Sequence, residues 1–377
     1  MTSRERVIRT INFQEPDRVP LYLGGDFASI TPPAHIKMCN FIGLIGEYKT
    51  IESFSCVHNI DEKILQNLHI DVRSIFLKEP SNWKSKVNLD GSITTEWGID
   101  WKQVGPYKEF VSTPLRETII DDLETFPWPN PYDPGRTFGL KDEVRDLYKN
   151  SSYAIVAGLN VSGILEYCFW MRGMDQLCLD MYLNKKYVHT LVEKITEVII
   201  GFFDVLLREV GPYIQIVEWA DDLGSQKGLL FSPEMYREFF KPAEKKVINF
   251  IKSHTDAKLL FHSCGSIVDL LEDLIEIGVD IINPIQPLAA GMDPQTLKKR
   301  FGGRVCFHGG IDEQQLLPNA TPTEVETEVK RVIQILAPNG GYIVAPSHNI
   351  QIDVPCENVI AIYRAAKKYG VYPISEK

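Results

Sequence analysis

A histidine and a cysteine, His262 and Cys264, stand two positions apart at the end of an apolar run. Side chains two positions apart in an extended chain project to the same face, so an imidazole and a thiolate would converge on one point. Zn²⁺ takes such ligands at about 2.0–2.3 Å, and a catalytic zinc keeps an open position beside three protein ligands. We predict a zinc site with His348 as the favoured third ligand and His308 and Cys306 as alternatives. A buried thiol beside a capping histidine would explain the pair without a metal.

Further polar side chains follow other apolar runs at the points where those runs end. They are Asp26, Asn160, Glu218, Asp221, Asp222, Asn283, Gln286, His308, Asp312, His348 and Asn349. In a parallel barrel the active site is built from residues at the carboxyl ends of the strands. We therefore expect these side chains to meet at one mouth, although each one taken alone would also suit a helix cap.

The elements that would position these residues are short apolar runs that alternate with helical segments. The runs cover residues 18–24, 71–77, 153–158, 214–219, 258–262, 279–283, 304–308 and 341–345. Helices are expected over residues 2–12, 233–253, 266–277, 294–301, 322–337 and 355–369. Strand followed by helix, about eight times over, is typical of an α/β fold of the (β/α)8 TIM-barrel type.

The stretch from about 80 to 135 interrupts this alternation. Residues 87–97 predict a β-hairpin around Asp90 and Gly91, because Asp-Gly between two strand-like runs is a strong short turn signal. Aromatic residues and a proline-rich segment over residues 126–134 follow the hairpin. We interpret the stretch as a β-rich insertion that caps one mouth of a single barrel domain spanning residues 1–377.

The composition argues against several kinds of partner. The 377 residues carry 40 Lys and Arg against 50 Asp and Glu, a net charge of -10. An acidic surface disfavours nucleic acids and anionic membranes, which require a basic footprint. We find no apolar run long enough to span a bilayer and no signal-peptide pattern in the first residues. Seven cysteines without disulfide spacing favour a reducing, cytoplasmic setting.

Several of these segments resemble a known family. Residues 262–267, 277–286, 308–312 and 340–348 are similar to segments of the uroporphyrinogen decarboxylase superfamily, as is the stretch from Arg4 to Pro20. The resemblance implies a single (β/α)8 barrel. It also implies one of two chemistries: cofactor-free decarboxylation of a porphyrinogen, or zinc-dependent methyl transfer to or from a corrinoid protein.

The resemblance favours the methyltransferase branch of the superfamily. The decarboxylases grip their substrate carboxylates with an Arg-rich N-terminal segment, whereas residues 21–28 contain Asp26 and no arginine. The methyltransferases use a His-x-Cys pair and a second cysteine as zinc ligands. His262 and Cys264 match that pair, and His348 stands where the second cysteine is expected. An imidazole in place of a thiolate leaves the metal a stronger Lewis acid, which favours an oxygen-bound donor.

Together these observations predict a methyltransferase that moves a methyl group from a small methoxylated or methylated donor to the Co(I) of a corrinoid protein, an O-demethylase type of reaction. Zinc would polarise the donor oxygen, with Asp222 and His308 as the catalytic side chains. The expected substrate-binding residues are Asp26, Asn160, Trp170, Glu218, Asn283 and Gln286. Barrels of the superfamily often pair, which allows a homodimer.

Three alternatives stay open from the sequence. The enzyme could run the reverse half-reaction, from a methyl-corrinoid to a thiol or a folate. It could instead be a decarboxylase. It could also be a non-catalytic barrel that binds a small ligand.

Overall fold

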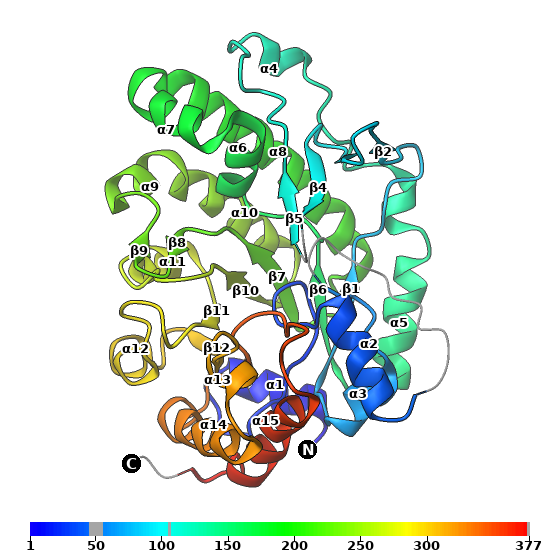
Figure 1. Ribbon diagram of the computed structural model, residues 1–377, viewed down its shortest axis with the longest axis vertical. Helices are drawn as coiled ribbons and strands as arrows, with labels where there is room; N and C mark the ends of the chain where they lie inside the picture. Colours follow the sequence, from blue (N-terminus) through cyan, green and yellow to red (C-terminus); the bar gives the residue numbers. More distant parts are fainter. Residues whose placement is uncertain (45–55, 105–106, 375–377) are drawn as a thin grey trace.

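The computed structural model describes residues 1–44, 56–104 and 107–374. Its centre is a curled sheet of seven parallel strands in the order β1-β6-β7-β10-β11-β12-β13, with helices around it (Figure 1). The strands are β1 (Val72–Phe76), β6 (Ala154–Gly158), β7 (Ile216–Ala220), β10 (Lys258–His262), β11 (Ile281–Ile285), β12 (Cys306–Ile311) and β13 (Tyr342–Pro346). Nearly all of their residues are buried, as expected for a parallel sheet that is covered by helices.

The segment Pro20–Tyr22 closes the sheet into a barrel between its two edge strands. The amide of Tyr22 donates to the Val344 carbonyl on β13 at 2.9 Å, and the Leu21 carbonyl accepts from the Asp71 amide, just before β1, at 2.9 Å. The predicted (β/α)8 fold is thus confirmed, but its first strand, expected over residues 18–24, is reduced to an isolated bridge. Pro20 has no N–H to donate, and Gly24 with its positive φ of 141° ends the extended run.

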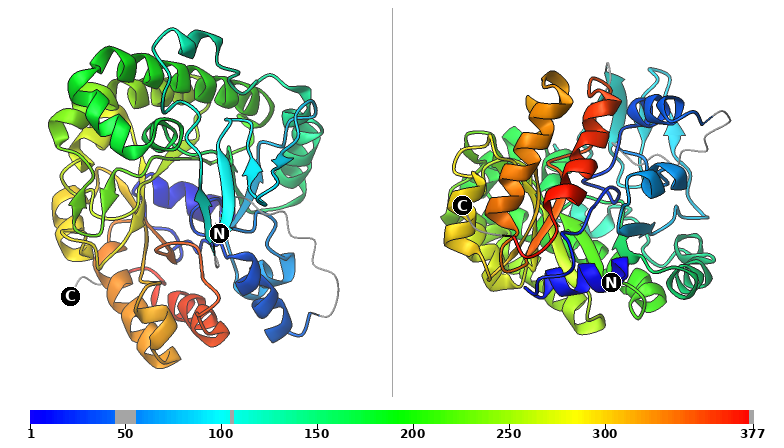
Figure 2. Two further views of the ribbon diagram at one scale, coloured as in Figure 1. Left: turned by 45° about the horizontal axis from the view of Figure 1, so that its top comes forward. Right: turned by 90° about the horizontal axis from the view of Figure 1, so that it is seen from below.

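The helices form the outer layer, and Figure 2 shows them around the strands from two further directions. Those that cover the barrel are α1 (Ser3–Ile11), α5 (Leu140–Asn150), α6 (Ile164–Arg172), α7 (Met174–Leu183), α8 (Lys185–Val210), α9 (Pro233–Phe239), α10 (Lys241–His254), α11 (Leu271–Ile277), α12 (Pro294–Phe301), α14 (Pro322–Leu336) and α15 (Cys356–Tyr369). Shorter elements are α2 (Pro32–Phe41), α3 (Glu62–Asn67), α4 (Asp122–Thr125), α13 (Leu316–Asn319), the 3₁₀ turn η1 (Pro134–Thr137), β8 (Gly224–Ser225) and β9 (Gly228–Leu229). None of the described helices combines the length and apolarity needed to cross a bilayer.

Two sequence expectations differ from the observed elements in instructive ways. The helix expected over residues 233–253 is divided into α9 and α10, because Pro242 at the start of α10 cannot continue the hydrogen-bond ladder of α9. The strand expected over residues 279–283 is β11, two residues later, with a register shift between Ile282 and Ile285. Pro284 lies inside this irregularity, where a missing N–H is tolerated.

The insertion forms a second, antiparallel sheet. Its strands β2 (Lys86–Val87), β3 (Ile93–Thr94), β4 (Asp100–Val104) and β5 (Tyr107–Phe110) pair in sequence order. The predicted hairpin is confirmed, with Gly91 in the turn at a φ of 81°. The buried Trp97 stacks on Tyr167 of α6 with the ring centroids 3.8 Å apart. This contact fastens the insertion to the barrel beside α6 (Figure 1).

A buried ion cluster joins the closing segment to its neighbours. The Asp71 carboxylate is fully buried and accepts from the Leu21 amide at 2.8 Å. Arg6 of α1 and Arg18, before the closing segment, each donate to the same carboxylate at 2.7 Å. One side chain therefore holds α1, the closing segment and the start of β1 together.

Replacing Asp71 by asparagine should lower the free energy of unfolding by about 3–5 kcal/mol, because the largely buried Arg18 guanidinium would lose its counter-charge and Arg6 would keep only Asp17. Chemical denaturation measures the change. The matched control is Glu272→Gln, which removes the exposed partner of the half-exposed Arg304 and should cost less than about 1 kcal/mol. Equal losses in the two variants would show that the Asp71 cluster does not hold the barrel closed.

Candidate functional site

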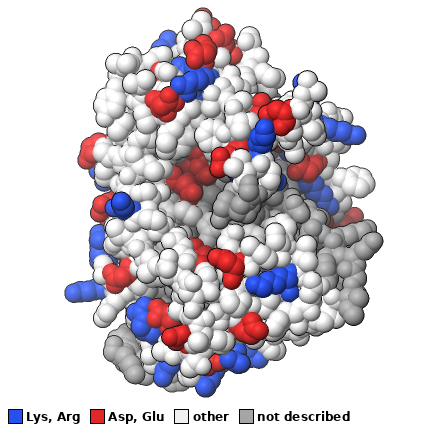
Figure 3. Space-filling view, viewed as in Figure 1, with Lys and Arg blue, Asp and Glu red and all other residues white. Residues whose placement is uncertain are grey.

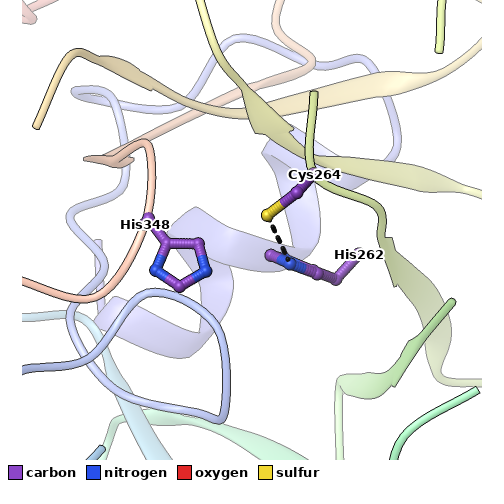
Figure 4. A group of neighbouring side chains, drawn as sticks. All are labelled: His262, Cys264 and His348. Carbon is purple, nitrogen blue, oxygen red and sulfur yellow. Dashed lines mark hydrogen bonds between the residues drawn. The ribbon is translucent and has the colours of Figure 1, made fainter. Parts of the chain in front are cut away.

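His262, Cys264 and His348 lie together at the carboxyl end of the barrel. Their ligand-type atoms are all within 4.8 Å of one another. His262 ends β10, Cys264 follows it two residues later, and His348 follows β13. The Cys264 Sγ lies 3.2 Å from the His262 Nε2, and Figure 4 shows the His348 ring facing this pair across a gap. Two segments that are far apart in the sequence thus supply two imidazoles and a thiol to one point.

Neighbouring strands orient the His262 ring. Asn283 lies opposite His262 in the register of β10 and β11, and its Oδ1 accepts from the His262 Nδ1. This hydrogen bond assigns the proton to Nδ1 and leaves the Nε2 lone pair toward Cys264. Phe27 stacks on the ring with a centroid separation of 4.3 Å. Burial lowers the pKa of His262 to about 3, so the imidazole is neutral, as a metal ligand must be.

The two alternative third ligands lie elsewhere. His308 is fully buried behind Asn283, whose Nδ2 donates to the His308 Nδ1 at 2.6 Å. Cys306 begins β12 and therefore lies at the amino end of the barrel, where its Sγ contacts the Thr10 carbonyl at 3.8 Å. Of the three histidine and cysteine candidates, His348 is the one that the structure brings to His262 and Cys264.

A cavity of about 630 Å³ lies above this group, where the front of the molecule is hollowed and acidic side chains gather at the edge (Figure 3). The strand ends and the insertion both contribute to its wall. Six residues predicted for the site line it: Asp26, Asn160, Trp170, Asp222, His262 and His348. Four others, Glu218, Asn283, Gln286 and His308, are buried and lie outside the described lining, as does the partly exposed Cys264. Their hydrogen bonds run to other residues of the site.

Gln286 supports the loop that carries Cys264. Its Oε1 accepts from the Gly265 amide at 2.9 Å and from the Gln226 side chain at 2.8 Å. The Cys264 amide in turn donates to the Asp222 carboxylate at 2.7 Å. The loop is therefore held from both sides, which fixes the direction of the thiol.

A second polar network surrounds Asp26. The Glu218 carboxylate accepts from the Tyr22 hydroxyl and from the Asp26 amide, the latter at 3.1 Å. The Asp26 carboxylate pairs with His58 Nε2 at 2.7 Å and accepts from the Asn160 amide at 3.3 Å. Burial raises the pKa of Glu218 to about 8, and the Asp26 charge adds to the shift. The charged form of Glu218 is thus disfavoured at neutral pH.

The Asp26 network also holds a second set of potential metal ligands. Ligand-type atoms of Asp26, Cys56 and His58 lie within 4.8 Å of one another. The Cys56 thiol donates to the Asp26 carbonyl at 3.5 Å, and the His58 ring stacks on Phe76. These contacts already explain the arrangement as an aspartate–histidine hydrogen bond with an adjacent thiol.

The two acidic residues that follow β7, Asp221 and Asp222, have different roles. Asp221 accepts from the Leu165 and Glu166 amides at 2.7 and 3.1 Å, so it caps α6. Asp222 opens into the cavity, where 38% of its side chain is exposed. Sequence reasoning did not single out Glu166, which also lines the cavity. Glu166 and Trp170 are four residues apart, so both lie on one face of α6.

Replacing Glu218 by glutamine should remove a pH dependence of stability. A carboxyl whose pKa is raised on folding favours the folded state below its unfolded pKa and loses that contribution as the pH rises toward 8. Between about pH 5 and 7.5 the unfolding free energy of the parent should therefore fall by up to about 1.4 kcal/mol per pH unit relative to Glu218→Gln. Parallel pH profiles, measured by denaturation, would contradict the raised pKa.

Comparison with known proteins relates this barrel to two kinds of enzyme. Uroporphyrinogen decarboxylase from Magnetococcus marinus is 24% identical over 198 residues, 51% of this chain and 51% of that protein. Methylated-thiol–coenzyme M methyltransferase from Methanosarcina mazei is 24% identical over 262 residues, 68% of this chain and 65% of that protein. The chain thus spans about half to two thirds of the length of these curated relatives.

A solved structure and a family model extend these matches. The structure, a methyltransferase from Methanosarcina mazei, superposes with a TM-score of 0.67 at 14% identity and covers 98% of this chain and 99% of that one. At this identity the likeness shows a shared barrel fold. The model of the uroporphyrinogen decarboxylase (URO-D) family matches residues 112–369, more than half of the chain. The protein therefore belongs to the uroporphyrinogen decarboxylase family.

Proposed function

We propose that the protein is a zinc-dependent methyltransferase that moves a methyl group from a small methylated or methoxylated donor to the Co(I) of a corrinoid protein. The observation that carries the proposal is that His262, Cys264 and His348 lie together at the carboxyl end of the barrel, where His262 and His348 line the cavity. The methyltransferase relative from Methanosarcina mazei supports the reaction class.

The donor set suits zinc. Two imidazole nitrogens and one thiol sulfur are the ligand types that Zn²⁺ prefers, and three protein ligands leave one position for a substrate. Asn283 holds the His262 ring by its other nitrogen, as outer partners do in zinc sites. When bound here, zinc would act as a Lewis acid toward an oxygen of the donor.

The side chains around this group would bind and orient the donor. Asp222 is fixed by the Cys264 amide while its carboxylate faces the cavity, so it can hydrogen-bond the donor or its leaving group. His308 has no such access, and burial lowers its pKa to about 3. We assign His308 a positioning role through Asn283 in place of the proton transfer expected from the sequence.

The cavity wall disfavours the decarboxylase alternative. The described lining includes five carboxylates, Asp26, Glu79, Glu96, Glu166 and Asp222, whereas Lys108 is its one Lys or Arg. A porphyrinogen with several carboxylate arms would meet charge of its own sign in this wall. The corrinoid partner would have to approach the open mouth of the cavity.

The metal site can be tested by zinc content. The parent protein should bind one zinc per chain, and Cys264→Ala should weaken zinc affinity by about 100-fold, because a thiolate ligand is lost. The matched control is Cys306→Ala, which removes a buried thiol at the opposite end of the barrel and should keep the metal. Metal titration of the parent and the two variants measures the zinc affinities. Equal zinc affinities of the three proteins would contradict the proposed zinc site.

The reaction can be tested with the zinc-loaded protein, Co(I) cobalamin as the acceptor, and a panel of methoxylated and methylated compounds. Conversion of the Co(I) spectrum to that of methylcobalamin with at least one donor is the expected result, and His348→Ala should reduce its rate by at least about tenfold. Decarboxylation of uroporphyrinogen by metal-free protein, without methyl transfer from any donor, would overturn the proposal.

A further inference from the structure

We propose that the ligand of this cavity is an organic cation, whose ammonium group is received between the aromatic wall and the carboxylate of Glu166. The aromatic wall consists of Trp97, Trp101, Tyr167 and Trp170. The inference deepens the proposed function, because it names the charge class of the methyl donor, but the binding itself requires neither metal nor corrinoid.

The aromatic wall is one connected cluster built by two elements. Trp97 and Trp101 come from the insertion, and Tyr167 and Trp170 come from α6. Trp97 stacks on Tyr167, Trp170 meets Tyr167 edge to face at 5.4 Å, and Trp101 meets Trp170 in the same way at 5.0 Å. The π faces of such rings attract ammonium groups, most strongly where water is excluded. The wall therefore suits a cation with apolar substituents.

The adjoining carboxyl groups make this wall acidic, and a bound cation would favour the charged form of Glu166. Two of the lining acids already have side-chain partners, since Asp26 contacts the His58 Nε2 and Glu96 pairs with Arg136. Within the described part of the chain, no Lys or Arg forms an ion pair with Glu166. Burial and the neighbouring charge of Asp222 raise the pKa of Glu166, so a cation bound beside it would relieve both penalties.

Helix α6 places an aromatic ring and a carboxyl group beside each other at the cavity. Glu166 and Trp170 are one turn apart on α6 and line the cavity together. A neutral aryl ether could stack on the rings but would offer no positive charge to the Glu166 carboxylate, which accepts a hydrogen bond from the Gly163 amide at 3.4 Å. A small inorganic cation would gain little from the apolar ring surface because it holds its water tightly. An organic ammonium ion would interact both with the aromatic wall and with the Glu166 carboxylate.

The test compares choline with 3,3-dimethylbutan-1-ol, which has the same shape but no charge. Isothermal titration of the whole protein, as purified and after zinc loading, should show choline at least tenfold tighter than the neutral analogue. Glu166→Gln should weaken choline at least tenfold and leave the neutral analogue unchanged. Equal affinities of the two ligands, or no effect of Glu166→Gln on choline, would overturn the inference.

Control variants separate binding from folding. Glu193→Gln removes an exposed carboxylate that pairs with Lys246 on the outer helices, and it should leave choline affinity unchanged. Trp170→Phe keeps a ring and should retain most of the affinity, whereas Trp170→Leu should lose at least fivefold. Circular dichroism melts of each variant establish that it is folded at the titration temperature.

The two proposals fail in different ways. Tight choline binding without any methyl transfer to Co(I) would overturn the proposed function and support the cation site. Methyl transfer from neutral methoxylated donors that choline does not inhibit would support the proposed function and overturn the cation site.

Discussion

The closed barrel depends on one charge cluster, in which the buried Asp71 carboxylate pairs with Arg6 and Arg18 and the Asp17 carboxylate pairs with Arg6 as well. The segment that completes the barrel contains a proline and makes only an isolated bridge, so backbone hydrogen bonds alone hold it weakly. The ion cluster adds stability that the few backbone hydrogen bonds of this segment do not provide. Asp26 lies four residues beyond this segment and lines the cavity, so the closing segment leads into one part of the cavity wall.

A row of side-chain hydrogen bonds across three strands orients the histidine rings of the candidate site. His262, Asn283 and His308 occupy neighbouring strands, and each contacts the next through side-chain atoms. An amide at the centre can accept from one ring and donate to the other, which assigns the proton on both imidazoles. The row leaves the His262 Nε2 toward the cavity without requiring any charged group behind it.

The sequence predicted the fold and much of the candidate site because both depend on local patterns. Alternating strands and helices indicated the barrel, and the carboxyl ends of strands indicated His262, Asp222 and His348. The role of Cys306 could not be decided from composition, since only its position at the start of β12 places it at the far end. Glu166 was missed because its access to the cavity depends on how α6 packs, which no spacing reveals. The assignment of these side chains to metal and donor stays a prediction.

Two different parts of the chain supply the residues in and around the cavity. The His-Cys-His group belongs to the barrel, whereas Trp97 and Trp101 belong to the insertion, which occupies one continuous stretch of the chain: Trp101 lies on β4 and Trp97 in the turn before it. A change within that stretch can alter what the cavity admits while the strands that carry the ligands keep their register. The architecture thus permits the preference for a ligand to diverge between relatives independently of the chemistry performed on it.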